Sequence, residues 1–353
     1  MNLNGLGFDR ALEAQAAPLL TPGRSVARIS AVDRGGYRVR TADAELRAVL
    51  TGRFRFSAPA ATDRPCVGDW VCIERLPSGM PALIHAVLPR KNFLRRKCAG
   101  PSVDYQMIAA NLDGVFILQG CRRDFNLARL QRYLVMAADG GVRPFLVLSK
   151  TDLVTAGELE RRLDEIRRAG ISAPVLPLSN ETDRGLDAVR DALVPSRTYG
   201  LLGSSGVGKT TLINKLSGRE LLPVRDVSQS GKGVHTTTRR QLIVLENGAL
   251  LIDTPGLREL GLIGDDGGPG DAFADIAEYA GQCRFPDCTH VQEPGCAVRA
   301  ALESGGLSPE RYRNYSKLAR EMAFHRLSYV EKRRKEKAFG KRVKSALRRL
   351  QDE

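Results

Sequence analysis

Residues 203–210 have the sequence GSSGVGKT, and this stretch decides the fold. It follows a predicted strand at 198–202 and precedes an apolar helical pattern at 211–216, which predicts a strand, a phosphate-binding loop and a helix in succession. The glycines let backbone N–H groups turn inward around phosphate oxygens, and the N-terminus of the helix adds its positive end. The lysine would contact the β- and γ-phosphates, and the next hydroxyl would bind Mg²⁺. The residues expected to contact the nucleotide here are Gly203, Ser204, Ser205, Gly206, Val207, Gly208, Lys209, Thr210 and Thr211.

A second motif, Asp253-Thr254-Pro255-Gly256, ends a predicted strand. Asp253 could hold Mg²⁺ through water, and the N–H of Gly256 could meet the γ-phosphate. Upstream lies the polar, glycine-rich stretch 230–238, which is typical of a loop that orders on γ-phosphate binding. Either Thr236 or Thr237 would complete the magnesium coordination. The alternatives are a simple turn and an ordinary flexible loop, and the phosphate loop nearby disfavours both.

The third motif is Ser149-Lys150-Thr151-Asp152, which follows an apolar strand pattern at 143–148. A carboxylate at Asp152 can accept hydrogen bonds from guanine N1–H and its amino group, and adenine offers no such pair. Lys150 would pack its stem along the ring, and Ser179-Asn180, after another strand, could place a backbone N–H near guanine O6. A helix cap is the alternative. The residues expected to read the base are Ser149, Lys150, Thr151, Asp152, Ser179 and Asn180.

The order of these motifs is permuted, because the base-reading motif precedes the phosphate loop and the magnesium motif comes last. In an ordinary GTPase the phosphate loop comes first. From residue 104 to about 261, predicted strands and helices alternate, which indicates a three-layer α/β domain.

A cysteine and histidine cluster follows the α/β pattern, with ligand spacing suited to tetrahedral Zn²⁺. Its members are Cys283, Cys288, His290 and Cys296. No fifth acidic ligand is evident, so a structural zinc site is favoured over a catalytic one, and free thiols beside a surface histidine are the alternative. The other cysteines show no ligand spacing, and the odd total of 7 argues against a disulfide framework and for a reducing cytoplasm.

The region before the α/β domain predicts a small β-barrel. Five short strand patterns separated by glycine turns lie at 25–32, 37–41, 46–50, 70–75 and 82–88. They fit an oligonucleotide-binding (OB) barrel, and other small barrels fit nearly as well. Residues 1–23 are expected to form a mobile tail that contains one helix. The basic run at 90–97 fits a solvated linker or an RNA contact equally.

The composition suggests a polyanionic partner. The chain has 353 residues, a formal net charge of +14 and a pI of about 9.7, which favour nucleic acid over the alternative of a merely soluble basic surface. Ser308-Pro309 predicts the start of a helix, and the segment 332–349 is densely basic. Neither a signal peptide nor a run long enough to span a membrane is expected.

Together the permuted order, the sequence GVHTTT at 233–238 and the cysteine cluster resemble the RsgA (YjeQ) family of ribosome small-subunit-dependent GTPases, over about 24–323. The resemblance implies an N-terminal OB domain, a circularly permuted GTPase domain and a C-terminal zinc domain. It further implies GTP hydrolysis with Mg²⁺, stimulation by the small (30S) subunit, contact with its 16S rRNA late in assembly, and a cytoplasmic monomer. The alternatives are a large-subunit assembly GTPase and an RNA-binding protein with a vestigial nucleotide site.

Three positions depart from the pattern of this family or of GTPases generally. Ser149 stands where the family usually has asparagine, and Asn180 stands where it usually has alanine, so guanine affinity could be reduced. Leu257 occupies the position of the water-orienting glutamine in many GTPases, and leucine cannot orient water. We therefore predict that His235 orients or deprotonates the water, with a packing role as the alternative.

The expected division of the chain has five parts. These are a tail at 1–23, an OB domain at 24–97, a permuted GTPase domain at 98–262, a helical zinc domain at 263–330 and a basic tail at 331–353.

Overall fold

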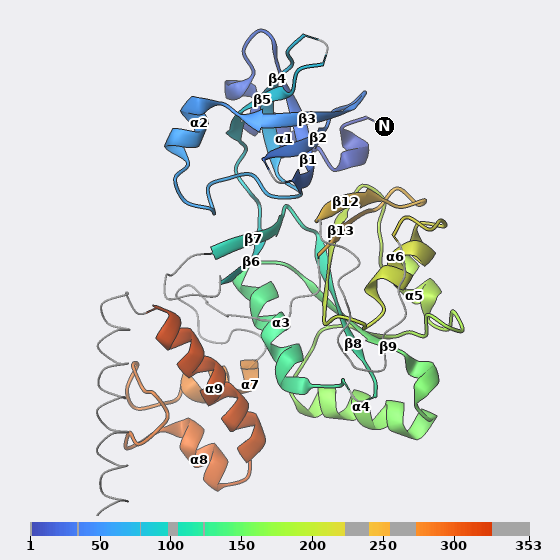
Figure 1. The fold of residues 1–353 in the computed structure, drawn as a ribbon. Helices are drawn as coiled ribbons and strands as arrows, with labels where there is room; N and C mark the ends of the chain where they lie inside the picture. Colours follow the sequence, from blue (N-terminus) through green and yellow to red (C-terminus); the bar gives the residue numbers. More distant parts are fainter. Residues whose placement is uncertain are drawn as a thin grey trace, which may run out of the picture.

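A computed structural model describes residues 2–33, 35–77, 79–97, 105–122, 124–222, 240–254 and 273–326. A β-barrel, a central α/β domain and a helical segment follow one another through the molecule (Figure 1). The predicted site residues His235, Thr236, Thr237 and Gly256, with Leu257 and the basic tail, lie outside these ranges. Within them, no helix is both long and apolar enough to cross a membrane.

The N-terminal barrel is closed and has five strands, as the sequence predicted. Its strands are β1 (Arg24–Asp33), β2 (Gly36–Arg40), β3 (Glu45–Leu50), β4 (Trp70–Glu74) and β5 (Ala82–Val87). They are ordered β1-β2-β3-β5-β4, β1 also pairs with β4, and β3 runs parallel to β5. A short helix, α2 (Gly52–Ser57), joins β3 to β4, and this arrangement fits the OB fold.

The first twenty residues differ from the expected mobile tail. They form η1 (Asn4–Leu6), α1 (Arg10–Ala16) and η2 (Ala17–Leu19). Leu6 is 1% exposed, the ring of Phe8 lies 5.0 Å from that of Trp70, and the thiol of Cys72 donates to the carbonyl of Leu19 at 3.3 Å. The segment is therefore part of the folded body, because its few apolar side chains reach an apolar edge of the barrel.

The central domain is a six-stranded sheet between helices. Its strands, in spatial order, are β10 (Val175–Pro177), β9 (Pro144–Ser149), β8 (Gly114–Gly120), β11 (Thr198–Gly203), β13 (Leu250–Asp253) and β12 (Gln241–Val244). Every neighbouring pair is parallel except β12–β13. Alternate β8 side chains enter two separate cores, one under α3 (Leu127–Asp139) and α4 (Ala156–Arg168), the other under α5 (Leu186–Asp191) and α6 (Lys209–Leu216). The expected three-layer arrangement is confirmed.

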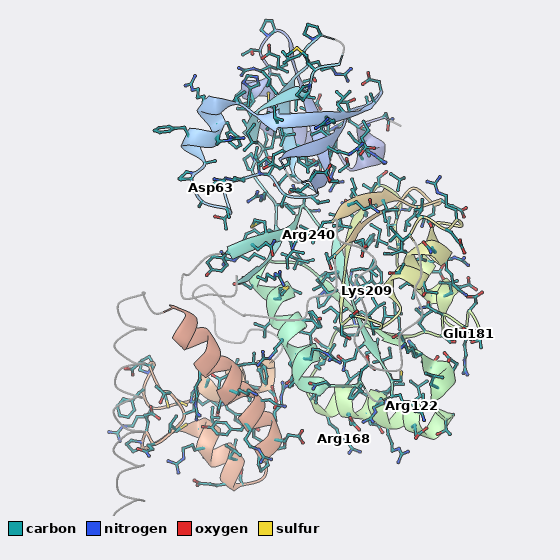
Figure 2. All side chains as sticks on the ribbon, in the orientation of Figure 1. Asp63, Arg122, Arg168, Glu181, Lys209 and Arg240 are labelled. Atoms are coloured by element: carbon teal, nitrogen blue, oxygen red, sulfur yellow. The ribbon has the colours of Figure 1, made fainter. Side chains whose placement is uncertain are left out.

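Two connections join the barrel to the sheet. Ala31 of β1 pairs with Gln241 of β12, and β6 (Phe93–Lys97) forms a hairpin with β7 (Tyr105–Ala110) between the two domains. Arg240, just before β12, donates to the carbonyl of Met107 in β7 at 3.0 Å (Figure 2).

The basic run at 90–97 has internal partners that the sequence did not predict. Arg90 forms a two-pronged ion pair with the buried Asp69 at 2.8 and 2.7 Å, and Arg95 lies 3.4 Å from Asp139. For these two arginines, neither the solvated linker nor the RNA contact describes the structure.

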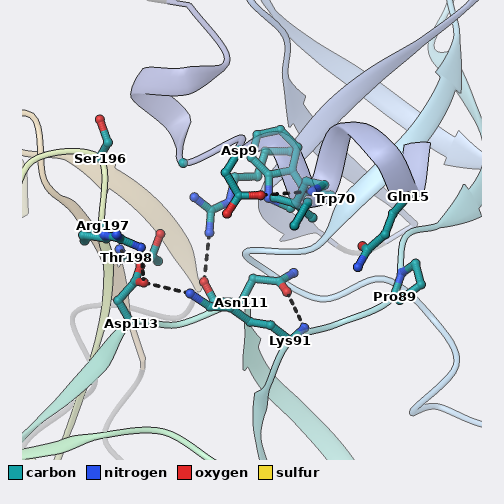
Figure 3. A pocket seen from close by; sticks show the side chains of 14 residues that line it. Asp9, Gln15, Trp70, Pro89, Lys91, Asn111, Asp113, Ser196, Arg197 and Thr198 are labelled. Carbon is teal, nitrogen blue, oxygen red and sulfur yellow. Dashed lines mark hydrogen bonds and ion pairs between the residues drawn. The ribbon is translucent and has the colours of Figure 1, made fainter. Parts of the chain in front are cut away.

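Arg28 is a buried junction between three segments, which no sequence pattern predicted. It is 1% exposed and donates to the carbonyls of Leu6, Gly68 and Asn111. Burial lowers its pKa to about 10, so it remains charged at neutral pH. It lines a pocket of about 200 Å³ beside Trp70, where the N-terminal segment, the barrel and the sheet domain meet (Figure 3).

The C-terminal segment contains α7 (Ala274–Ala280), α8 (Ala297–Glu303) and α9 (Pro309–Arg326). The hydroxyl of Ser308 accepts the backbone N–H of Arg311 at 3.1 Å, which confirms the predicted helix start. The Arg311 side chain forms two hydrogen bonds with Asp275, at 3.0 and 2.7 Å. Both groups lie against Gly170, just after α4, where an added Cβ would lie 3.2 Å from the guanidinium. This contact joins the helical segment to the sheet domain.

Candidate nucleotide and metal sites

The predicted nucleotide motifs gather at one edge of the central sheet. The phosphate loop follows β11, Lys150 and Asp152 follow β9, Ser179 follows β10, and Asp253 ends β13. Because these strands are parallel, their carboxyl ends meet at the same edge, where open α/β sheets bind ligands. Motifs about a hundred residues apart in the sequence thus become neighbours.

Lys209, labelled in Figure 2, lies at the first turn of α6, and its side chain contacts two carbonyls of the phosphate loop. Its ammonium group is 2.7 Å from the carbonyls of both Gly203 and Ser204, and the residue is 9% exposed. Gly208 has a φ of 98°, which favours glycine. Burial lowers the pKa of Lys209 to about 8, and the nearby Asp253 carboxylate opposes this shift in part. The loop therefore holds a positive charge that is poorly solvated.

Asp253 is buried at the end of β13, with 3% of its surface exposed. The adjacent Thr254 hydroxyl donates to the carbonyl of Leu201 in the neighbouring strand, which fixes the chain where it leaves the sheet. A carboxylate here and the Thr210 hydroxyl at the first turn of α6 are oxygen ligands of the kind Mg²⁺ prefers. Asp253 pairs with Leu201 of β11, the strand that leads into the phosphate loop, so the carboxylate lies beside the start of the loop. The residues present fit a magnesium site.

Asp152 is held in place by a neighbouring base-reading loop. The hydroxyl of Ser179 donates to the Asp152 carboxylate at 2.6 Å and accepts the backbone N–H groups of Glu181 and Thr182 at 3.2 and 3.1 Å. Lys150 has a φ of 62°, so the chain turns sharply between the end of β9 and Asp152. These hydrogen bonds fix the orientation of the Asp152 carboxylate.

Both residues that depart from the family pattern contact the phosphate loop. The hydroxyl of Ser149, which is fully buried, donates to the carbonyl of Val207 at 2.8 Å. The side-chain amide of Asn180 donates to the carbonyl of Gly208 at 3.0 Å. Sequence reasoning treated these positions only as contacts to the base. Their contact with the phosphate loop had one sign in the sequence, which was the departure of both positions from the residues that the family usually has.

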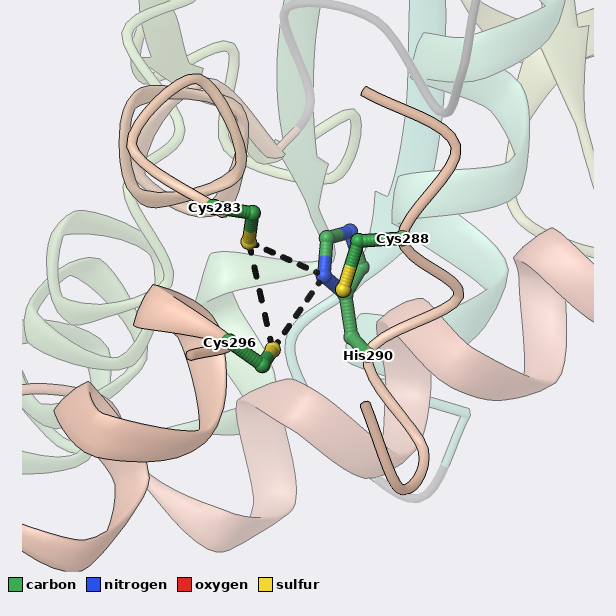
Figure 4. A group of neighbouring side chains, drawn as sticks. All are labelled: Cys283, Cys288, His290 and Cys296. Atoms are coloured by element: carbon green, nitrogen blue, oxygen red, sulfur yellow. Dashed lines mark hydrogen bonds between the residues drawn. The ribbon is translucent and has the colours of Figure 1, made fainter. Parts of the chain in front are cut away.

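The four side chains of the cysteine and histidine cluster converge on one point (Figure 4). The ligand atoms of Cys283, Cys288, His290 and Cys296 all lie within 4.8 Å of one another. The histidine Nδ1 is 3.6 and 3.5 Å from the sulfurs of Cys283 and Cys296, which are 3.9 Å apart. Tetrahedral Zn²⁺ with ordinary bond lengths would place two sulfurs about 3.8 Å apart and a sulfur and a nitrogen about 3.6 Å apart. The cluster could therefore hold a zinc ion.

The loop that carries the cluster is held by hydrogen bonds outside the ligands. The Glu293 carboxylate accepts backbone N–H groups of Thr289, Val291 and Gln292 at 3.0, 3.0 and 3.1 Å. The hydroxyl of Tyr312 in α9 donates to the carbonyl of His290 at 2.5 Å. Such outer contacts orient metal ligands in other proteins.

Comparison with known proteins gives matches along most of the chain. The family model described as RsgA GTPase matches residues 87–263. A protein of Opitutus terrae named small ribosomal subunit biogenesis GTPase RsgA is 42% identical, over 92% of this chain and 90% of its own length. A Lactiplantibacillus plantarum protein named small ribosomal subunit biogenesis GTPase RsgA 2 is 40% identical, over 99% and 98%.

Two solved structures match most of the chain. The crystal structure of YjeQ from Thermotoga maritima covers 85% of this chain and 99% of its own, with a TM-score of 0.63 and 25% identity. The structure of YloQ, described as a circularly permuted GTPase, covers 87% and 97% with a TM-score of 0.59, and at 23% identity it shows the fold alone. These structures confirm the permuted order that the motifs indicated.

Proposed function

Because this chain belongs to the RsgA family of GTPases, we propose that it binds the small (30S) ribosomal subunit late in its assembly and hydrolyses GTP to GDP and phosphate with stimulation by the subunit. The observation that carries the proposal is the convergence of Lys209, Asp253 and Asp152 at one sheet edge, in a chain that also carries a barrel and a metal cluster. The proposed action on the small ribosomal subunit is supported by the names of the relatives. The protein would act in the cytoplasm as a monomer.

The residues of the site divide the work between phosphates and base. Backbone N–H groups of the phosphate loop would cradle the phosphates, while Lys209 would leave the loop carbonyls and bind the β- and γ-phosphate oxygens. Asp152, oriented by Ser179, would accept from the guanine. Thr210, Asp253 and either Thr236 or Thr237 would hold Mg²⁺, which would neutralise negative charge on the phosphates.

Asp152→Asn should weaken GTP binding by about 10²- to 10³-fold, because hydrogen bonds to a charged group contribute about 1.5–3 kcal/mol each, and the amide loses one of the two and keeps the other only as a weaker neutral bond. Affinity for xanthosine triphosphate should rise, since xanthine carries a carbonyl where guanine has its amino group and the new amide can donate to it. Titration of both nucleotides with the full chain tests this. Asp183→Asn, which alters an exposed carboxylate paired with Lys215, is the control. An unchanged GTP affinity in Asp152→Asn would contradict the assignment.

His235 remains our candidate for orienting or deprotonating the attacking water, an assignment that rests on the sequence. His235→Ala should lower subunit-stimulated hydrolysis by about 10²-fold or more, with little change in GTP affinity. Single-turnover hydrolysis with saturating small subunits provides the measurement. His85→Ala, which removes a hydrogen bond to Glu74 in the barrel, is the matched control. Wild-type turnover in the His235 variant would leave a packing role only.

The metal cluster would hold one structural Zn²⁺. All four candidate ligands come from the same loop region and leave no position for a substrate, so the ion would stabilise the fold of the segment around α8.

Helix α2 offers a surface suited to RNA. The side chain of Phe56 is 90% exposed, and Arg53 and Arg55 beside it are also exposed. An exposed ring can stack on an unpaired base while neighbouring guanidinium groups bind phosphates. We propose that this face contacts 16S rRNA.

Phe56→Ala should weaken binding to the small subunit by about 5- to 100-fold, which corresponds to about 1–3 kcal/mol for one stacked base. Replacing Arg53 and Arg55 with alanine should instead flatten the salt dependence of binding, by about one unit of slope for each phosphate that an arginine neutralises. Sedimentation with small subunits at several salt concentrations separates the two effects. Val194→Ala, which truncates a half-exposed side chain after α5, is the control. Equal binding by the Phe56 variant and wild type would exclude α2 from the interface.

GTP turnover with small subunits, with large subunits and without ribosomes tests the proposed function as a whole. Stimulation by small subunits alone is the expected result. Stimulation by large subunits would favour the large-subunit factor, and an absence of turnover under every condition would favour a vestigial nucleotide site.

A further inference from the structure

Two side chains from the base-reading loops donate to consecutive carbonyls of the phosphate loop. Ser149, at the end of β9, binds the carbonyl of Val207, and Asn180, after β10, binds the carbonyl of Gly208. The acceptors are the last two residues of the loop before α6. The contacts therefore fix the point at which the loop becomes a helix.

The hydrogen bond between Asn180 and Gly208 requires one orientation of the side-chain amide, and the two residues are in close contact. A carbonyl oxygen only accepts, so the amide nitrogen of Asn180 must face Gly208. The carbonyl of Gly208 also accepts the N–H of Leu212 at 3.0 Å, which is the first hydrogen bond of α6. A Cβ on Gly208 would lie 2.6 Å from the Asn180 nitrogen, so the side chain packs directly on the glycine. The Asn180 oxygen is buried and has no hydrogen-bond partner in the part of the chain that the structure describes.

The buried Asn180 oxygen, without a hydrogen-bond partner among the described residues, costs free energy, and the hydrogen bond from the Asn180 nitrogen to the phosphate loop offsets this cost. Burying one end of a carboxamide without a partner costs about 1–3 kcal/mol. A small apolar residue at position 180 would avoid that cost. Position 149 carries a short hydroxyl that reaches one carbonyl, and position 180 carries the longer amide that reaches the next.

We propose that Asn180 is a positioning residue for nucleotide binding, and that it and Ser149 together clamp the base-reading loops to the phosphate loop. The inference rests on the GTP site proposed above and assigns Asn180 a role separate from base recognition. Because the clamp acts on the loop around the phosphates, its removal lowers affinity for GTP and GDP alike and leaves the preference for guanine to Asp152. An asparagine at position 149 would lie against the same stretch of loop, so it should replace the amide removed from position 180.

The test compares wild type, Asn180→Ala, Ser149→Asn and the double variant, all as full chains. Affinities are measured for GTP, GDP and ITP, since inosine lacks the amino group that Asp152 binds. Asn180→Ala should weaken GTP and GDP equally, by about 3- to 10-fold, as expected for one neutral hydrogen bond. Its GTP/ITP ratio should match wild type, and the double variant should return to within about twofold of wild-type affinity.

Asn214→Ala is the matched structural control. Asn214 lies at the other end of α6, where its side chain bonds Leu221 and Leu222. This variant should lower the melting temperature without changing nucleotide affinity, which distinguishes positioning from general stability.

Three results would overturn the proposal. These are wild-type affinity in Asn180→Ala, a weakening that Ser149→Asn does not rescue, and a collapse of the GTP/ITP ratio, which would assign Asn180 to the base. Failure of wild type to bind GTP would instead overturn the proposed function on which the inference rests.

Discussion

Replacing Lys209 with alanine should lower kcat for GTP hydrolysis by about 10²- to 10³-fold and weaken GTP binding as well, because the loop loses the positive charge placed to meet the γ-phosphate. The residue is 9% exposed, and its ammonium group is already held inside the loop by two carbonyls. When the ammonium group moves onto phosphate oxygens, it exchanges neutral hydrogen-bond acceptors for charged ones. The attraction between the ammonium group and the phosphates is strongest where water is excluded. Turnover with small subunits and GTP titration measure both effects.

Lys215→Ala is the control for this substitution, since it removes a lysine from the same helix that pairs with the exposed Asp183. It should hydrolyse GTP at the wild-type rate. If kcat of the Lys209→Ala variant were within tenfold of the wild-type value, the charge of Lys209 would not be used in the reaction.

The pH dependence of GTP affinity gives a second check on Lys209. Without nucleotide its pKa is about 8, and bound phosphates should raise it. Binding above pH 8 must then take up a proton, so affinity should fall by up to about tenfold per pH unit above that value. The contribution of Lys209 to folding stability changes with pH in the opposite direction to the GTP affinity. Because the folded pKa lies below that of the unfolded chain, the charged lysine is destabilising below pH 8, and this cost is relieved as the pH rises toward 10.5.

Cys296→Ser should abolish the zinc binding proposed for the cluster, unfold the segment around α8 and abolish binding to the small subunit, while GTP binding persists. A structural zinc site contributes on the order of 10 kcal/mol to folding. Only two small side chains of α8 itself, Val298 and Ala301, are buried, so the helix contributes little apolar burial of its own in place of the metal. Zinc content by mass spectrometry, limited proteolysis and sedimentation with small subunits follow the three effects.

Cys72→Ser is the matched control, because this buried thiol belongs to β4 of the barrel, which lies at the other end of the molecule from α8 (Figure 1). It should retain one zinc ion. If Cys296→Ser kept stoichiometric zinc, the ligand assignment would be wrong. If it released zinc yet resisted protease and bound the subunit, the ion would be dispensable for the fold.

Much of the architecture was predictable because its signals are local. The alternating patterns predicted the five barrel strands, and the structure confirms a closed barrel. The glycines and lysine of 203–210 predicted a strand, a loop and a helix, which are β11, the phosphate loop and α6. The expected mobile tail was wrong, because the apolar contacts of Leu6 and Phe8 form only against a barrel that is already folded.

The sequence by itself determined the identity of the motifs and their permuted order, since each motif is a short run whose spacing carries its chemistry. The tertiary structure alone decided what the motifs touch. Ser149 and Asn180 lie 58 and 28 positions from their partners in the phosphate loop, and Arg28 lies 83 positions from Asn111. Such pairs leave no periodic signal, because their contact depends on strand order and on the common edge where parallel strands end. Permutation could therefore reorder the motifs along the chain and still leave them neighbours at that edge.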